Sequence, residues 1–118
     1  MAWRNEKGQR HRVDGPAVEH PNGDFEWWLN GERHRVDGPA RVDTDGTQLW
    51  YLNDELHRVD GPAYIRKDKY QSWYLNGQWH RLDGPARIWA DGRTEWWVNG
   101  QQLTEFEIWV LTGAKEVV

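Results

Sequence analysis

The fold is decided by residues 34–56, HRVDGPARVDTDGTQLWYLNDEL, a stretch of 23 residues that recurs along the chain. Its heptapeptide HRVDGPA also begins at His11 and His57, and the variant HRLDGPA begins at His80, so each copy starts 23 residues after the one before. A second block, WYLND in this stretch, recurs at the same spacing, and its copies begin at Trp27, Trp50, Trp73 and Trp96. A period between about 20 and 50 residues is typical of proteins built from stacked structural units.

Each unit carries the turn residues of an antiparallel hairpin. Residues 37–39, Asp-Gly-Pro, and residues 44–46, Thr-Asp-Gly, are turn sequences, and proline is acceptable at the start of a strand over 40–43. Residues 48–52 are rich in strand formers and lead into 53–54, where the other copies have the Asn-Gly of a two-residue hairpin turn. We therefore predict an all-β fold: a single elongated antiparallel β-meander of four 23-residue hairpin repeats with a short C-terminal capping helix.

The repeats predict a single domain over residues 1–118. It comprises a partial N-terminal unit at 1–10, repeats at 11–33, 34–56, 57–79 and 80–102, and a C-terminal helical cap at 103–118. In the cap, Thr104 and Glu107 have the spacing of a capping box, and Leu103 with Ile108 that of a hydrophobic staple. Gly113 is the expected C-cap. We expect this helix to fold over the last strand and to cover an otherwise open sheet edge.

Alternation along the strands predicts aromatic ladders on both faces of the sheet. Trp50 shares a face with Leu52, and Tyr51 points to the opposite face. We expect each histidine to form one hydrogen bond through a ring nitrogen and to pack against the aromatic ladder. The residues to which we assign such structural roles are His11, His34, His57, His80, Trp27, Trp50, Trp73 and Trp96.

Composition limits the classes of function. Ten of the 118 residues are Trp and 14% are aromatic, whereas only 37% are hydrophobic, which favours a thin structure with aromatic ladders over a thick aliphatic core. The net charge of −4 argues against a nucleic-acid partner. No apolar stretch approaches the ~20 residues of a membrane span, so we predict no membrane insertion. With no cysteine, the chain is expected to be soluble and cytoplasmic.

The pattern resembles the MORN repeat, the membrane occupation and recognition nexus. The stretch that carries the resemblance is GPARIWADGRTEWWVNGQ, residues 84–101: a hairpin with a central glycine, then aromatic positions, then Asn-Gly. The resemblance covers about residues 11–102, and the HR-x-DGPA form is similar to divergent units of phage, bacterial and giant-virus proteins. It implies scaffolding and protein binding. For a phage-type chain it implies a small accessory protein that acts in the host cytoplasm and blocks a host factor.

The repeated polar residues invite metal and catalytic hypotheses, and spacing argues against both. Two strands per unit put equivalent histidines ~10 Å apart, too far to share a metal whose ligands lie at ~2 Å. We therefore predict no metal and no cofactor. Ser72 is the only serine, there is no cysteine, and four equivalent His/Asp pairs are a product of repetition. For the repeated Arg and Asp we expect inter-repeat salt bridges and turn hydrogen bonds, with an anion-binding row as the alternative.

Residues that break the repeat are our candidates for function. Two columns of equivalent positions, one holding Tyr64 and Arg87 and the other Arg66 and Trp89, lie two residues apart and share a face. Aromatic side chains together with arginine are typical of binding hot spots. The predicted binding residues are Tyr64, Arg66, Tyr70, Trp79, Arg87 and Trp89. The alternative is that Trp79 and Trp89 pack under the C-terminal helix.

These observations predict a non-enzymatic binding protein. The first hypothesis is a protein partner that contacts the variable face. The second is a nucleotide or sugar that stacks on Trp, Tyr and Arg. An enzyme ranks third. A homodimer is conceivable through the N-terminal sheet edge near Trp3.

Overall fold

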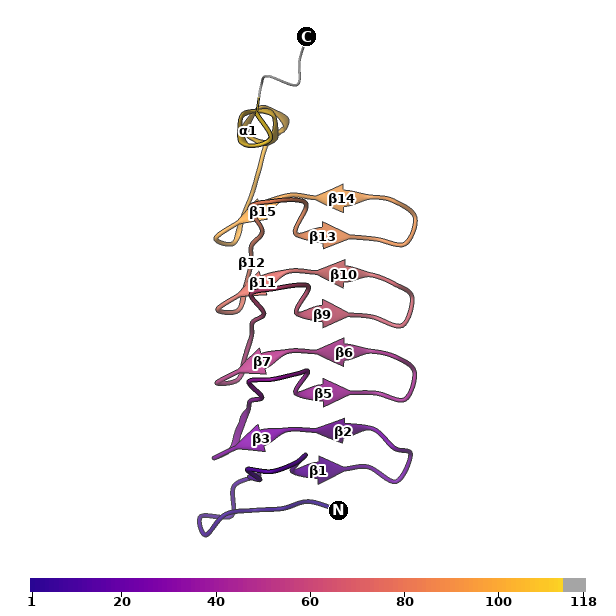
Figure 1. Cartoon of the computed structure of the whole chain (residues 1–118), viewed down its shortest axis with the longest axis vertical. Helices are drawn as coiled ribbons and strands as arrows, with labels where there is room; N and C mark the ends of the chain where they lie inside the picture. The colour runs from indigo at the N-terminus through magenta and orange to yellow at the C-terminus, as the bar shows by residue number, and fades with distance from the viewer. Residues whose placement is uncertain (114–118) are drawn as a thin grey trace.

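The computed structural model describes residues 1–113 and shows an elongated stack of 61 × 26 × 19 Å. Figure 1 shows the long hairpins lying one above another along the longest axis, with one helix at the C-terminal end. All strand pairs are antiparallel and follow the chain order. The predicted all-β meander with a short C-terminal helix is confirmed.

The strands form two systems. One is an eight-stranded sheet, which in spatial order comprises β1 (Val18–Glu19), β2 (Phe25–Glu26), β5 (Arg41–Val42), β6 (Gln48–Leu49), β9 (Tyr64–Ile65), β10 (Gln71–Ser72), β13 (Arg87–Ile88) and β14 (Thr94–Glu95). The other is a column of small hairpins: β3 (Trp28–Leu29) with β4 (Glu32–Arg33), β7 (Tyr51–Leu52) with β8 (Glu55–Leu56), β11 (Tyr74–Leu75) with β12 (Gln78–Trp79), and β15 (Trp97–Val98) with β16 (Gln101–Gln102).

The two systems separate because the chain changes sheet at each repeated tryptophan. The Trp50 N–H donates to Ala63 O of the next unit at 2.7 Å, and Trp50 O accepts from His57 N at 3.0 Å. The predicted continuous run over 48–52 is therefore wrong, since β6 ends before Trp50 and β7 begins after it. Trp50 and Tyr51 do not lie on opposite faces of one sheet; their rings belong to two different columns of contacts.

The histidine of each heptapeptide holds the next small hairpin in place. The Nδ1 atom of His34 accepts the backbone N–H of Asn53 at 3.0 Å, which fixes a turn residue with a φ of 48°. The same bond recurs from His11 to Asn30, from His57 to Asn76 and from His80 to Asn99. The prediction of one hydrogen bond through a ring nitrogen is confirmed for these four histidines, with Nδ1 as the acceptor.

The core is thin and consists mainly of small side chains. Four equivalent alanines are fully buried: Ala17, Ala40, Ala63 and Ala86. Each lies where two units approach, as Ala40 does by donating its N–H to Leu49 O and accepting that of Trp27. Beyond this column, large rings and arginine side chains provide most of the packing, as the composition predicts.

Between units, the main side-chain contact is an arginine stacked on a tryptophan. The Arg58 guanidinium lies 4.0 Å from the Trp50 ring centroid, and its other side faces Gly61, where a Cβ would lie 2.8 Å from Cζ. Its Nη1 donates to Pro62 O at 3.0 Å. We call this arrangement of tryptophan, arginine and glycine the guanidinium clamp. The other clamp pairs are Arg12 on Trp3, Arg35 on Trp27 and Arg81 on Trp73.

The clamp corrects one expectation about the charged residues. The Arg58 Nε atom binds Asp60 at 3.1 Å, within the same heptapeptide, and the other three heptapeptides do the same. The predicted inter-repeat salt bridges between these residues are therefore wrong. Arginine is stacked against the preceding unit by its ring contact, and the short spacing of Arg-x-Asp keeps the carboxylate beside its own arginine.

The N-terminal edge is occupied by the chain itself. Residues 1–4 run beside β1, with Trp3 N–H donating to Ala17 O at 2.7 Å and Glu19 N–H donating to Met1 O at 2.8 Å. Trp3 takes the first position in the row of clamps, although the 23-residue period would place Arg4 there. The turn of residues 5–8 is longer than its equivalents, and this shift hides Trp3 from the repeat pattern.

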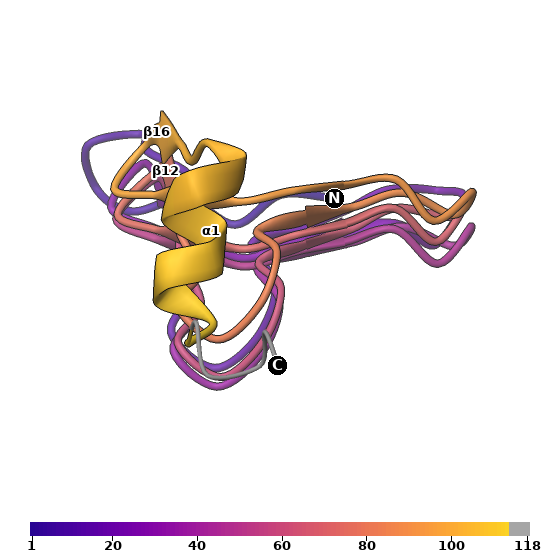
Figure 2. The ribbon, with the colours of Figure 1, turned by 90° about the horizontal axis from the view of Figure 1, so that it is seen from above.

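Helix α1 (Glu105–Leu111) ends the stack. Its predicted capping box is confirmed by reciprocal bonds between Thr104 and Glu107, and Gly113, with a φ of 89°, follows the C-cap Thr112. Figure 2 shows α1 lying across the end of the small-hairpin column, while the long hairpins extend beyond it. The helix thus lies over the end of the column that contains the last strand, as predicted, whereas the long hairpin at the outer edge of the eight-stranded sheet extends beyond it (Figure 2). Residues 114–118 of the predicted cap lie outside the described residues.

We expect Gly61→Ala to destabilise the protein by about 1–3 kcal/mol, because the added methyl displaces Arg58 from the clamp. Gly61 does not have a positive φ, so its backbone conformation does not require glycine, and the loss of stability should depend on the presence of Arg58. A double-mutant cycle with Arg58→Ala, measured by urea unfolding, tests this. If Gly61→Ala costs the same in both backgrounds, the glycine serves the backbone and not the clamp.

Candidate binding surfaces

The predicted binding residues come together around Arg87. Arg87 Nε donates to Tyr70 Oη at 2.8 Å, and its Nη1 atom pairs with Glu95 at 3.1 Å. Its guanidinium carbon lies 4.2 Å from the Trp79 ring centroid and 4.5 Å from that of Trp89. One cation thus joins residues from β12, β13 and two neighbouring long hairpins.

Tyr70 is the second centre of this group and is buried. Its ring centroid lies 5.8 Å from that of Tyr64 and 5.3 Å from that of Trp89, and the Arg66 guanidinium carbon lies 4.7 Å away. The structure therefore places all the predicted residues in one connected group. We call it the Arg87 cluster: Tyr64, Arg66, Tyr70, Trp79, Arg87 and Trp89.

Arg66, Tyr70 and Arg87 form side-chain hydrogen bonds within the protein, whereas the buried Trp79 indole N–H has no partner among the described residues. Arg66 forms two hydrogen bonds to Asp68, at 2.8 and 2.7 Å, and these lower the pKa of that carboxyl to about 2. Glu95, the partner of Arg87, also accepts the Trp97 indole N–H at 2.9 Å. The cluster fills space that aliphatic residues fill in thicker proteins.

The two tryptophans of the cluster have neighbours other than the helix. Trp79 lies between Tyr74 and Trp97, with ring centroid distances of 5.9 and 4.7 Å. Trp89 contacts Tyr70 and two arginines. The groove beside α1 is lined instead by aliphatic and helix residues, among them Leu82, Val98 and Phe106. The alternative that both tryptophans pack under the helix does not hold.

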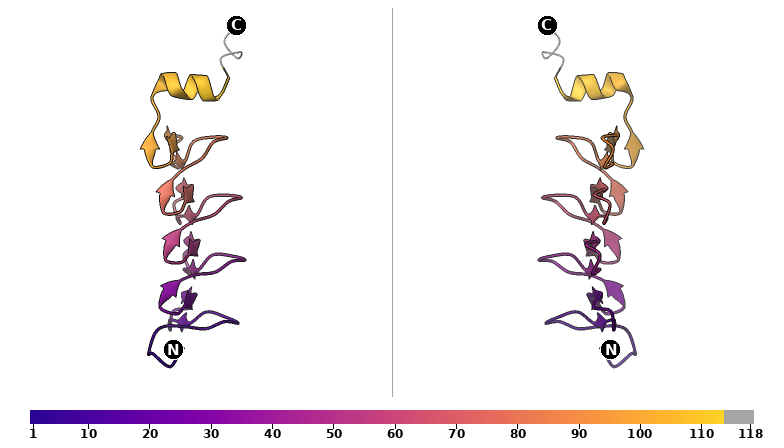
Figure 3. Two further views of the ribbon diagram at one scale, coloured as in Figure 1. Left: turned by 90° about the vertical axis from the view of Figure 1, so that its left-hand side faces the viewer. Right: turned by 90° about the vertical axis from the view of Figure 1, so that its right-hand side faces the viewer.

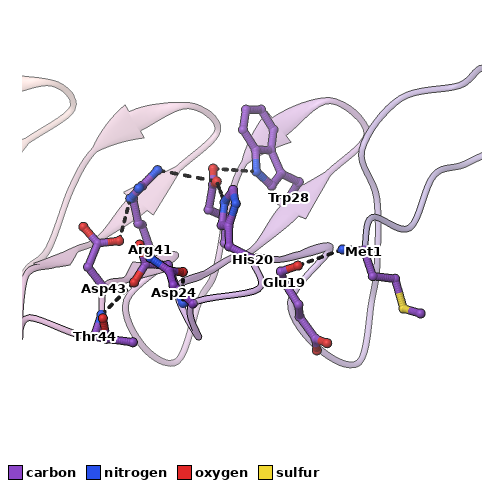
Figure 4. A network of polar contacts seen from close by, with 10 residues as sticks. Met1, Glu19, His20, Asp24, Trp28, Arg41, Asp43 and Thr44 are labelled. Carbon is purple, nitrogen blue, oxygen red and sulfur yellow. Dashed lines mark hydrogen bonds and ion pairs between the residues drawn. The ribbon is translucent and has the colours of Figure 1, made fainter.

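A second network, around the buried Glu26, lies at the N-terminal end. His20 Nε2 lies 2.7 Å from its carboxylate, Trp28 donates to it at 3.1 Å, and Arg41 approaches to 3.4 Å. Figure 4 shows these three side chains converging, with Arg41 also bound to Asp43. Burial would raise the pKa of Glu26, but the bonds from His20 and Trp28 and the charge of Arg41 outweigh it and lower the pKa.

Sequence reasoning missed Glu26 although the signal was present. Glu26 and Glu95 occupy the same position in the first and last repeats, and each accepts an indole N–H from the tryptophan two residues on. The two middle repeats have Leu49 and Ser72 there. A glutamate that occurs at this position only in the first and last repeats, two residues before a tryptophan, was therefore the signal that each end of the stack has its own polar network.

A different surface is formed by the heptapeptide loops. Figure 3 shows these loops stacked on one side of the ribbon. The third residue of each heptapeptide points to solvent: Val13 is 77% exposed, Val36 82%, Val59 83% and Leu82 59%. We call this row of four residues the loop ridge. It was missed because recurrence alone marked these residues as structural, whereas their exposure shows that folding does not bury them.

Open grooves separate successive loops of the ridge. The groove between the second and third loops has a volume of about 600 Å³, with Trp50 and Leu52 among its lining residues and Val36 and Val59 on either side. Its equivalents between the other loops have volumes of about 530 and 490 Å³. After Leu82, α1 takes the place of a further loop, and Phe106 and Val110 line that last groove.

The loops that carry the ridge also expose acidic side chains. The aspartates of the four heptapeptides are 84–88% exposed, whereas the arginines beside them are only 23–27% exposed because they lie in the clamps. The formal charges within each loop cancel, but solvent meets mainly the carboxylate. In residues 1–113 no three acidic, histidine or cysteine side chains gather as a metal site requires. The same residues contain no helix with the length and apolar character to cross a membrane.

We expect Glu26→Gln to remove part of the protein's acid sensitivity. A carboxylate whose pKa is lowered in the folded state stabilises it fully above its ordinary pKa of about 4.3, and this contribution is lost as pH falls through the lower folded value. Thermal unfolding from about pH 5 to pH 2 should therefore show a shallower loss of stability in the variant than in the wild type. The exposed Glu55→Gln is the matched control and should keep the wild-type slope.

Arg87→Met should destabilise the protein by about 2–3 kcal/mol, since it leaves Tyr70 Oη and Glu95 without their charged partner. Arg93→Met is the control: Arg93 lies over the same Trp89 ring but is largely exposed, so its loss should cost within about 0.5 kcal/mol. Urea unfolding measures both. Equal costs would show that the Arg87 cluster does not contribute to stability.

Comparisons of this chain with protein-family models, with curated proteins and with solved structures find no match. The resemblance to MORN repeats therefore stays a prediction from the residues quoted above.

Proposed function

We propose that this chain is a non-enzymatic, MORN-like repeat protein that binds another protein through its loop ridge. The observation that carries the proposal is the exposed apolar residue that each of the four heptapeptides places on the same side of the ribbon. A patch of exposed apolar residues in register marks an interaction surface more often than isolated ones do.

Exposed positions elsewhere in the repeat behave differently. The exposed residue near the tip of each small hairpin is polar in every unit: Glu32, Glu55, Gln78 and Gln101. At these exposed positions, where no packing contact requires an apolar residue, the repeat therefore has polar side chains. The ridge keeps Val, Val, Val and Leu at positions that are also exposed, and burying one such side chain in a partner stabilises a complex by about 1.5–3 kcal/mol.

The ridge is also held rigid before binding. Each loop is held by its clamp, by the bond from arginine to the proline carbonyl and by the histidine bond to the next hairpin. Preorganised loops lose little conformational freedom when a partner binds, which favours affinity. Arg87 and Tyr70, at the centre of the Arg87 cluster, are already bonded within the chain, so a stacked nucleotide or sugar would have to compete with those bonds.

The phage-type resemblance extends the proposal. It suggests a viral accessory protein that binds and inhibits a host protein in the host cytoplasm. The exposed ridge is consistent with such a role because an inhibitor needs a rigid surface and no catalytic group.

The double variant Val36→Ser/Val59→Ser should lose partner binding at least tenfold while its stability changes by within about 0.5 kcal/mol, since both residues are exposed. Candidate partners are captured from host lysate on the wild-type protein, purified and titrated by calorimetry against both proteins. Trp89→Ala is the comparison for the other surface. A purified partner that binds the double variant with wild-type affinity would place the interface away from the ridge.

A further inference from the structure

We infer that the partner presents a cationic, amphipathic segment that lies along the loop ridge, with its apolar side chains between the loops and its Lys or Arg side chains at the heptapeptide aspartates. This inference rests on the proposed function and adds the chemistry of the partner. It comes from three observations: the free carboxylate oxygens, the regular grooves and the acidic character of the chain's own helix.

Each heptapeptide aspartate is only partly engaged. Asp37 Oδ1 accepts from Arg35 Nε at 3.1 Å, while its Oδ2 atom forms no hydrogen bond to any described residue, and Asp60 is bound in the same way. The Nη1 atom of each arginine donates instead to the proline carbonyl oxygen of the same heptapeptide. The ridge thus offers one free, highly exposed carboxylate oxygen beside each exposed valine, a surface that complements alternating cationic and apolar side chains.

The grooves set the spacing that a partner must match. Two strands per unit advance the ridge by about 10 Å from loop to loop. A polyproline II segment covers that distance in about three residues, with every third side chain on one face, and an α-helix covers it in about seven. A segment with cationic and apolar residues recurring at either interval would engage several loops at once.

The end of the ridge shows how a helix fits such a loop and why a second copy is not the favoured occupant. Phe106 and Val110, four residues apart on α1, line the groove beside Leu82. The first turn of α1 carries Glu105 and Glu107 and its last turn has no basic residue. The described helix of a second copy carries no basic side chain that could pair with the free carboxylate oxygens of the loops, so a cationic segment complements them better.

The test is a selection from a displayed library of random 20-residue peptides. Wild-type protein is the bait, and the Val36→Ser/Val59→Ser variant removes peptides that bind elsewhere. We expect enriched peptides to carry net positive charge with apolar residues every third or seventh position. As synthetic peptides, they should bind Asp37→Ser/Asp60→Ser at least tenfold more weakly, because serine keeps a hydrogen-bond acceptor at the turn but not the charge.

The outcomes separate the two proposals. Ridge-dependent peptides that are neutral or acidic, or that bind the aspartate variant with unchanged affinity, would overturn the cationic segment and leave the ridge as the binding surface. A selection that yields no ridge-dependent peptide would overturn both. Sedimentation adds a further check: a wild-type dimer that the valine variant cannot form would assign the ridge to a second copy. Circular dichroism of each variant verifies its fold.

Discussion

The structure depends on a guanidinium group held between a tryptophan ring and a glycine. In the clamp of Arg58, the ring of Trp50 belongs to the preceding unit, and Gly61 leaves the space that any larger residue would fill. The same arginine binds Pro62 O and Asp60, so one side chain joins two units and shapes the loop. Because the clamp holds the cation inward, it turns Val59 and the carboxylate of Asp60 toward solvent. Stacking and the exposed ridge are thus consequences of one contact.

Repeated and unrepeated residues both hold the stack together. The unrepeated Glu26 and Arg87 lie near the two ends of the stack, where they fill the thin interior with charged and aromatic groups. The repeated heptapeptide builds both the clamps and the ridge. In a stack of equal units, a row of equivalent exposed residues would let one partner engage several copies at a regular spacing, which is the basis of the proposed interface.

Local rules predicted the hairpins, the turn residues and the capping box of α1, since these depend on residues close in sequence. The change of sheet at Trp50 was missed because its N–H pairs with Ala63, a choice set by the neighbouring unit. Trp3 was missed because a longer turn breaks the period. The Arg87 cluster was assembled correctly from a shared strand face, but its burial and internal bonds depend on Tyr70 and Trp79 approaching from neighbouring hairpins.

The most direct test of the stacked clamps is deletion of one whole unit, residues 34–56. If corresponding residues are interchangeable, Arg58 stacks on Trp27, and the shortened chain folds. Small-angle scattering should then show a radius of gyration below 17.2 Å and a ribbon shortened from 61 Å by about 10 Å. The urea m-value should fall by about a fifth, because less surface is exposed on unfolding. A shortened chain that fails to fold, or that keeps the full length, would contradict the stacking of interchangeable units.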